Sequence, residues 1–230
     1  VQTEEELLAA FLSARQLSPL VVIEEELRGM VFRGTLIGGR LFAVIRREPP
    51  HVIGDGKSAV RELVRKANKN PLRRGPVFHE IPTGPEAERE LARQGLTWKS
   101  VLKKGRLVTL SEKISRGVGG TTTDYTDQTH PKNALMLEKI WAVLQDPFVG
   151  VDFIIEDIGK SWEAQPQCGV IECNSLPFID LHHYPFAGAP RNAAGAVWDL
   201  AFPDSGCSTT QSPIKRRKSS RRGSVPLSLK

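Results

Sequence analysis

Two short apolar segments constrain the fold of this chain more than any other feature. They read VGVDFII (Val149–Ile155) and CGVIECN (Cys168–Asn174), and each has the length and apolar content of a buried strand. Side chains alternate faces along a strand, so Glu172 and Asn174 point the same way. If the two strands pair antiparallel, Asp152 can lie opposite that polar row. Two carboxylates and an amide oxygen then converge on one sheet face.

This convergence predicts a metal site. Hard cations such as Mg²⁺, with Mn²⁺ as a substitute, take oxygen ligands and keep waters or substrate phosphates in their remaining positions. Asp152, Glu172 and Asn174 are therefore the expected metal ligands. The alternative is structural: Glu172 is a half-buried carboxylate paired with an arginine, and Asn174 begins the turn before Pro177.

The composition bounds the class of protein. A chain of 230 residues suits one or two domains, and 40% hydrophobic and 25% charged residues are ordinary for a globular protein. No apolar run approaches the length that spans a bilayer, and the start lacks a signal segment, so no membrane partner is expected. Cys168, Cys173 and Cys207 show no C-x-x-C spacing, which favours a reducing, cytoplasmic compartment.

The net charge of +6 is concentrated at one end. From Cys207 onward the chain carries seven Lys and Arg side chains and no acid, so the remainder is near −1 (6 − 7). A nucleic-acid binder spreads positive charge over a folded face, so nucleic acid is not an expected partner. Residues 205–230 are predicted to be a disordered basic tail, which leaves 1–204 as the folded region.

Local signals place the elements of an α+β fold with an antiparallel sheet and flanking helices. Thr3 and Glu6 form a capping box that opens an amphipathic helix, and Gly38-Gly39 is the turn of a hairpin. The other expected strands and helices follow from apolar periodicity and cap residues: strands at 20–23, 30–37, 40–47 and 107–110, and helices at 58–68, 86–94, 130–144 and 191–202. The ranges 49–56, 70–85, 111–124 and 175–190 are expected to be loops.

Two segments near the start of the chain suit a phosphate-dependent reaction. The apolar run at 20–23 leads into Glu24, Glu25 and Leu27, which can present a carboxylate and an apolar side chain to a purine. A solvated strand end is the alternative. Arg33, on the hairpin, can neutralise developing phosphoryl charge, although a single arginine is more often part of a surface ion pair.

The segment KISRGVGGT (Lys113–Thr121) is the third candidate. The amides of Gly119 and Gly120, together with the cations Lys113 and Arg116, can cradle an anion. A flexible surface loop is the alternative. The histidines lack zinc spacing with cysteine, His182 and His183 are expected to pack in a loop, and neither a P-loop nor a serine-hydrolase motif occurs.

Taken together, these pieces resemble the ATP-grasp ligases, in particular the ATP-grasp region of cyanophycin synthetase and of bifunctional bacterial glutathione synthetase. The resemblance is collinear from about Thr3 to Pro203. It is carried by VVIEEELRGMVFRGTLIGGRLFAVIRREPPHVIGDGKSAVRELV, LARQGLT, GGTTTDYTDQTHP, GVDFI and GVIECN.

The resemblance implies an ATP-dependent carboxylate–amine ligase. ATP phosphorylates the carboxylate of an amino acid or short peptide, and an amine attacks the acyl phosphate. By match, Mg²⁺ is bound by Asp152, Glu172 and Asn174, adenine lies near Glu24 and Leu27, and Arg33 lies near the acyl phosphate. Self-association is left open.

Two departures from the family pattern concern the nucleotide and the substrate. Val31 stands where relatives place an acidic residue for the ribose, and SRGVGG (115–120) replaces an Asn-x-Ser-x-Gly-Gly loop. The family's lysines and phosphate-covering glycine loop belong to a subdomain before Thr3, so the chain is expected to be a C-terminal portion that does not turn over ATP alone. The alternative is a divergent ATP-grasp module that binds nucleotide or a partner without catalysis.

Overall fold

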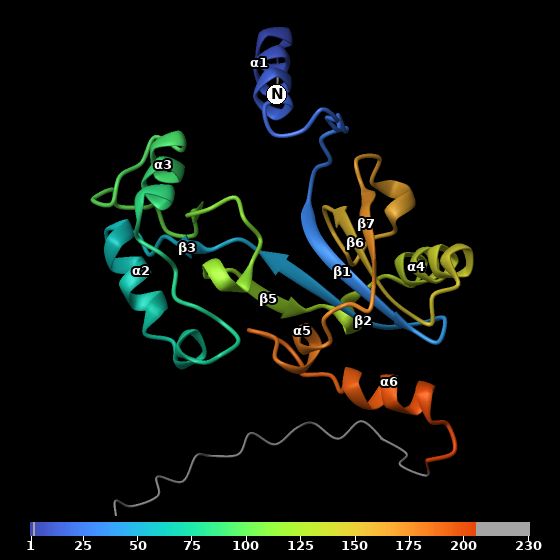
Figure 1. Cartoon of the computed structure of the whole chain (residues 1–230). Helices are drawn as coiled ribbons and strands as arrows, with labels where there is room; N and C mark the ends of the chain where they lie inside the picture. Colours follow the sequence, from blue (N-terminus) through green and yellow to red (C-terminus); the bar gives the residue numbers. More distant parts are fainter. Residues whose placement is uncertain (2, 206–230) are drawn as a thin grey trace, which may run out of the picture.

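The structure, a computed structural model, describes residues 1 and 3–205 (Figure 1). The predicted basic tail therefore lies, apart from its first residue, outside the described residues, and so does Cys207. Among the described helices, none is both long and apolar enough to span a bilayer.

A five-stranded antiparallel sheet forms the centre of the fold, in the order β5-β2-β1-β6-β7 (Figure 1). Its strands are β1 Met30–Ile37, β2 Arg40–Glu48, β5 Thr121–Asp124, β6 Phe148–Ile155 and β7 Gly169–Ser175. With helices around this sheet, the predicted α+β class is confirmed.

The predicted hairpin is β1–β2. Gly38 and Gly39 have φ angles of 58° and 82°, which glycine adopts without the steric cost that other residues carry. A side chain on Gly39 would also meet the Trp141 ring, at 2.8 Å from an added Cβ. The two-glycine loop is therefore required both by the turn and by the packing of the helix beside it.

The sheet has one apolar and one polar face because side chains alternate along each strand. Phe32 and Leu36 of β1 and Val151 and Phe153 of β6 are buried on the apolar face, where Leu137 of helix α4 (Pro131–Leu144) completes a single core cluster. Arg33 and Thr35 of β1 and Asp152 of β6 occupy the intervening positions and therefore share the polar face. The candidate site is on this second face.

A smaller unit packs beside the main sheet and has its own core (Figure 1). It combines strands β3 (His51–Ile53) and β4 (Leu107–Thr109) with helices α2 (Val60–Asn68) and α3 (Pro85–Arg93). The two helices and β4 were predicted, but β3 was expected to be a loop.

The remaining helices are short, apart from the first. They are α1 Glu4–Arg15, α5 Asp180–His183, α6 Ala193–Ala201 and four 3₁₀ turns, η1 Pro71–Arg74, η2 Arg116–Val118, η3 Thr126–Gln128 and η4 Trp162–Ala164. Thr3 caps α1 as predicted, since its Oγ1 accepts the Glu6 N–H at 3.2 Å. None of the residues of α1 is buried, and the helix stands away from the rest of the fold (Figure 1).

Several sequence predictions were wrong. The range 20–23 is not a strand: Leu20 is 84% exposed and Ile23 is 67% exposed, so the apolar run has no sheet partner among the described residues. The range 111–124 contains β5, and 175–190 contains α5. The helix predicted at 58–68 begins two residues later, at Val60, and the Ser58 hydroxyl donates to Asp55 Oδ2 at 2.7 Å instead of capping it.

Candidate functional site

The paired strands β6 and β7 bring the three predicted metal ligands together. Asp152 lies opposite Glu172 and Gly150 lies opposite Asn174, in the antiparallel register that the sequence suggested. A register shift just after Asp152 ends this regular stretch. Asn174 Nδ2 donates to Glu172 Oε1 at 3.0 Å, and this bond does not use the Asn174 amide oxygen. The expected convergence is therefore present.

Asp152 is buried between two arginines. Arg33 donates to both carboxylate oxygens, through Nε to Oδ1 and through Nη2 to Oδ2, the latter at 2.7 Å, and Arg47 Nη1 donates to Oδ2 at 3.0 Å. Burial by itself raises the pKa of Asp152. The hydrogen bonds and positive charges around the carboxylate, from Arg33 above all, outweigh burial and hold the pKa of Asp152 below its ordinary value. Asp152 is therefore ionised at neutral pH.

The donor set fits a divalent cation. Glu172 is 55% exposed in its side chain, and its Oε1 lies 3.9 Å from Arg33 Nη2, too far for a hydrogen bond. An ionised carboxylate offers about four acceptor positions, of which three on Asp152 are used, so one remains for a ligand bond. Two carboxylates and an amide oxygen are hard ligands of the kind Mg²⁺ takes. Among the described residues, no cluster of three or more His, Cys, Asp or Glu side chains offers a competing metal site.

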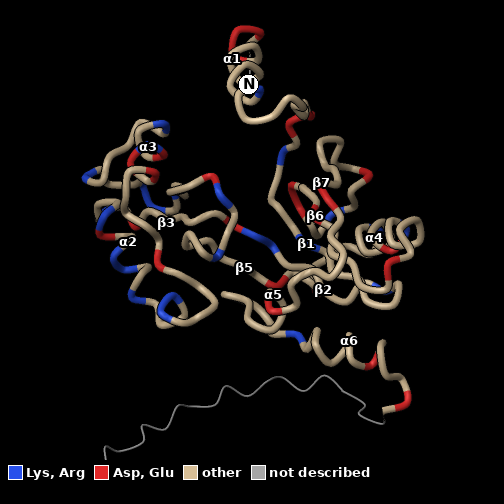
Figure 2. Tube along the Cα trace, in the orientation of Figure 1, with Lys and Arg blue, Asp and Glu red and all other residues tan. Residues whose placement is uncertain are grey.

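A cavity of 380 Å³ opens beside these residues and is lined by three arginines. Arg33 comes from β1, Arg47 from β2 and Arg116 from η2, and Glu48 is the carboxylate among the lining residues. Figure 2 shows basic positions on β2 near the middle of the trace, between the main sheet and the smaller unit. Such a cavity suits a negatively charged ligand.

Arg116 is held in this cavity from the far side of the site. Its Nη2 donates to Asp180 Oδ2 at 2.6 Å, and its guanidinium carbon is 6.0 Å from the centre of the Phe78 ring. Its Nη1 is buried without a hydrogen-bond partner, and so is Asp180 Oδ1. This ion pair thereby joins the turn that carries Arg116 to the helix α5.

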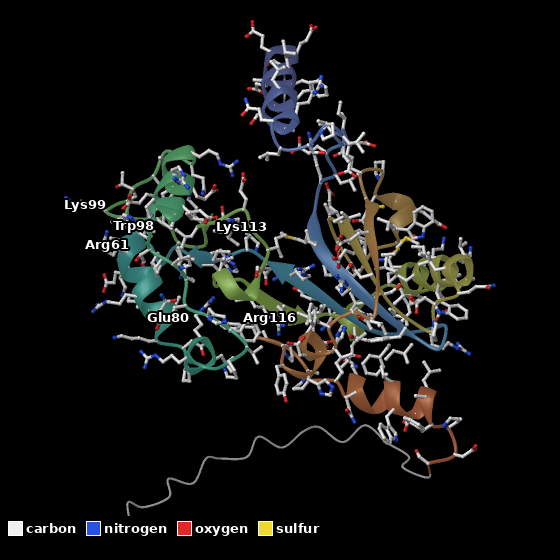
Figure 3. The ribbon with its side chains drawn as sticks, in the orientation of Figure 1. Arg61, Glu80, Trp98, Lys99, Lys113 and Arg116 are labelled. Carbon is white, nitrogen blue, oxygen red and sulfur yellow. The ribbon has the colours of Figure 1, made fainter. Side chains whose placement is uncertain are left out.

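Lys113 does not line the cavity. Its Nζ is 3.6 Å from Glu86 of α3, and its side chain is 68% exposed. Figure 3 labels Lys113 well apart from Arg116, although the two are only three positions apart in the sequence. The structure therefore does not bring Lys113 together with the other predicted catalytic side chains.

Close backbone packing explains why positions 119 and 120 are both glycine. Gly119 has a φ of 85°, and a Cβ there would lie 2.7 Å from Ile81 Cα. A Cβ on Gly120 would lie 2.6 Å from the Glu48 carbonyl oxygen. The Gly120 N–H is bonded to the Ser115 carbonyl at 2.9 Å. The loop is thus tightly packed against backbone.

The segment predicted to contact a base has no regular structure. Glu24 and Glu25 are exposed, and Leu27 is half-buried with its Cδ1 2.7 Å from the position of a Cβ on Gly169 at the start of β7. Leu27 therefore packs against the metal-bearing strand pair. The Arg28 N–H donates to the Gln167 carbonyl at 3.3 Å just before that strand.

Two residues of the site were missed by the sequence analysis. Arg47 stands opposite Val31 in the β1–β2 register, so it shares the face of Arg33; the Gly-Gly hairpin and strand alternation together carried enough information to find it. Asp180, which holds Arg116, comes from a loop with no periodic signal. His182, expected to pack in a loop, is buried with Nε2 2.7 Å from Thr35 Oγ1.

Known proteins are similar to this chain over most of its length. No family model matches the chain. It is 34% identical over 208 residues to a cyanophycin synthetase from Nostoc sp., covering 89% of this chain and 23% of that protein. It is 34% identical over 186 residues to a glutathione biosynthesis bifunctional protein from Clostridium perfringens, covering 79% of this chain and 24% of that protein.

A solved structure gives the same result in three dimensions. The bifunctional glutathione synthetase from Pasteurella multocida superposes with a TM-score of 0.67 at 32% identity, covering 78% of this chain and 24% of that one. The chain is therefore homologous to part of cyanophycin synthetase and to part of bifunctional glutathione synthetase. It spans about a quarter of the length of the relatives it matches.

Proposed function

We propose that the chain is the metal-bearing part of an ATP-dependent carboxylate–amine ligase acting on an amino acid or short peptide. The observation that carries the proposal is the placement of Arg33, Asp152 and Glu172 on one sheet face beside an arginine-lined cavity. The ATP-grasp homologues support the ligase class. That the acid substrate is an amino acid or short peptide, joined to an amine, is likewise proposed.

The proposed reaction has two steps. A substrate carboxylate oxygen attacks the γ-phosphorus of ATP, the bond to the ADP oxygen breaks, and an acyl phosphate forms. The amine nitrogen then attacks the acyl carbon, phosphate leaves, and the nitrogen loses a proton. Negative charge accumulates on the transferring phosphoryl oxygens, so positioning and positive charge supply most of the rate.

In this proposal the arginines of the cavity hold the phosphoryl group. Arg33 is fixed by Asp152 and carries the guanidinium closest to the metal ligands, while Arg47 and Arg116 line the same cavity. Because Arg116 has an unpaired buried Nη1, it has a donor available for an anionic ligand. Lys113 stays a proposed cation only if its loop moves away from Glu86.

Asp152, Glu172 and Asn174 would hold Mg²⁺, or Mn²⁺ in its place. A divalent cation there supplies charge neutralisation and orientation of the nucleotide phosphates. Glu24, Glu25 and Leu27 stay proposed contacts of the base. The amides of Gly119 and Gly120 stay proposed contacts of an anion, although their close backbone packing accounts for the glycines without a ligand.

A second function, a non-catalytic module that binds nucleotide or a partner, is favoured by one observation. Both oxygens of Asp152 already accept hydrogen bonds from arginine, and these bonds use three of the carboxylate's roughly four acceptor positions. If Asp152 stays bonded to Arg33 and Arg47, it does not bind a metal ion. Glu172 and Asn174 are then the remaining ligands, and the site binds nucleotide weakly.

Glu172→Ala in the complete product of the gene separates the two functions. The catalytic proposal expects loss of amide formation and of coupled ADP release, with the circular dichroism spectrum unchanged because Glu172 is exposed. Unchanged turnover in this variant would contradict the proposal. The 230-residue chain, assayed alongside it, is expected to bind Mg²⁺-nucleotide weakly and to release no ADP.

A further inference from the structure

A second, larger hollow lies against the opposite face of the β2–β5 pair. It has a volume of about 890 Å³ and runs between α2, η1, β3 and the strands β2 and β5. Arg46 and Thr123 are paired neighbours that face it, whereas Arg47 and Thr122 face the arginine-lined cavity. We call the larger hollow the α2 groove. The Lys, Arg and Glu residues that line it are Arg46, Glu48, Lys66, Lys69 and Arg73.

The α2 groove and the arginine-lined cavity share two lining residues at the end of the strand pair. Glu48 and Thr121 are opposite each other in the register and line both spaces. The groove is otherwise a separate space on the other face of the pair.

The groove has an excess of positive charge. Four Lys and Arg side chains line it against one carboxylate, Glu48, whose Oε1 accepts from Arg46 Nη2 at 2.8 Å. Lys66 Nζ lies 3.3 Å from a carboxylate oxygen of Asp55, a residue that does not line the groove. Lys69 is exposed and makes no ion pair with a described residue. The positive charges of Lys69 and Arg73 therefore have no carboxylate partner among the described residues of the groove.

Arg73 is the most unusual of these side chains. It is only 5% exposed, and within the described residues it has no carboxylate partner. Its Nη1 donates to the carbonyl oxygens of His79 at 3.1 Å and Gly119 at 2.6 Å, while its Nε has no partner. Burial lowers the pKa of Arg73, but a guanidinium stays charged at neutral pH. Buried charges in proteins are normally paired, so this one points to an anion supplied from outside the chain.

The groove favours a peptide over a nucleic acid. Phe186 is its one phenyl ring among the described lining residues, and the Arg73 guanidinium carbon already lies 5.0 Å from the centre of that ring. Single-stranded nucleic acids are bound by stacking bases on aromatic faces, and this face is partly taken. With a volume of about 890 Å³, the groove is large enough for a short peptide segment.

We infer that the α2 groove binds an acidic peptide segment. Carboxylates of the segment pair with Lys69 and the buried Arg73, and with Lys66 in exchange for Asp55. The inference stands apart from the proposed function, because the groove and the arginine-lined cavity lie on opposite faces of the strand pair.

The test is fluorescence anisotropy of labelled hexaglutamate with the 230-residue chain, without nucleotide or metal. Lys66→Ala/Lys69→Ala removes two exposed charges from the groove. Arg61→Ala/Arg65→Ala is a matched control that removes two charges from the same helix, on the side facing Trp98 (Figure 3). At about 0.1 M salt, the groove variant is expected to bind hexaglutamate about fivefold to twentyfold more weakly than the original chain. The control variant is expected to bind it within about twofold of the original chain.

Three outcomes would overturn the inference. They are equal losses in the two double variants, which would show a response to net charge alone; binding of labelled hexaglutamine as tight as that of hexaglutamate; and oligothymidylate binding that depends equally on Lys66 and Lys69. Since the assay contains no ATP, failure of the proposed ligase activity would leave the groove result standing, and the reverse also holds.

Discussion

Arg33 of β1 and Asp152 of β6 are directly opposed in the sheet and joined by two hydrogen bonds from one buried guanidinium to one buried carboxylate. The pair has two consequences. It fixes Arg33 toward the cavity, and it keeps Asp152 ionised beside Glu172. Structure and proposed chemistry therefore depend on the same contact.

Removing one partner of this pair is expected to destabilise the fold. Arg33→Met leaves a buried carboxylate with Arg47 alone, which we expect to lower the free energy of unfolding by about 3 kcal/mol. The measurement is urea denaturation followed by circular dichroism. Arg33→Met/Asp152→Leu removes both charges and is expected to recover most of the loss. A double variant as unstable as Arg33→Met would show that the charge pair is not the cause.

Acid is expected to weaken the fold through His182. Burial lowers the pKa of His182 from 6.5 to about 4, and its Nδ1 has no hydrogen-bond partner. Between these values the unfolded chain binds the proton and the folded chain does not, so stability is full above pH 6.5 and falls as the pH drops toward 4. At pH 5 the loss from this group is about 2 kcal/mol.

The measurement is the urea midpoint at pH 7 and pH 5. His182→Gln, which keeps a polar group near Thr35 but does not titrate, is expected to show a smaller drop between the two pH values. An undiminished drop in His182→Gln would assign the acid sensitivity to other groups.

Sequence patterns sufficed where local chemistry decides the structure. The Thr3 cap, the Gly38-Gly39 turn and the β6–β7 pair could be predicted because caps, positive φ angles and strand alternation are written in neighbouring residues. The convergence of Asp152, Glu172 and Asn174 followed from alternation and one assumption about strand direction.

The failures have a different cause. The run at 20–23 has the composition of a strand, but a strand forms only where a partner edge is available, and the described residues supply none. Strands β3 and β5 are short, lie next to proline or glycine residues that are typical of loops, and pair with distant segments. The Arg116–Asp180 contact joins positions 64 apart, which no local pattern specifies.

The glycine loop can be tested for a structural role. Gly119→Ala places a methyl group 2.7 Å from the Ile81 Cα in a residue with a φ of 85°, so backbone must move. Gly95 also has a positive φ, 68°, but an added Cβ meets nothing within 4 Å. Gly95→Ala is expected to cost about 1 kcal/mol from backbone strain, and Gly119→Ala about 2–4 kcal/mol because a clash is added. Thermal denaturation of the two variants gives the comparison, and equal costs would contradict the packing argument.

Glu172 offers the cleanest separation of binding from folding. Its side chain is 55% exposed and makes no hydrogen bond to Arg33, so Glu172→Gln is expected to change the free energy of unfolding by no more than about 0.5 kcal/mol. The same change removes a charged oxygen ligand. We therefore expect weaker Mg²⁺-dependent nucleotide binding, measured by isothermal titration with and without the cation. Glu163→Gln, at an exposed carboxylate on η4 that pairs with Lys132, is the matched control and is expected to leave both measurements unchanged apart from a small loss of stability. If Glu172→Gln bound Mg²⁺-nucleotide as the original chain does, Glu172 would not be a metal ligand, and the non-catalytic function would be favoured.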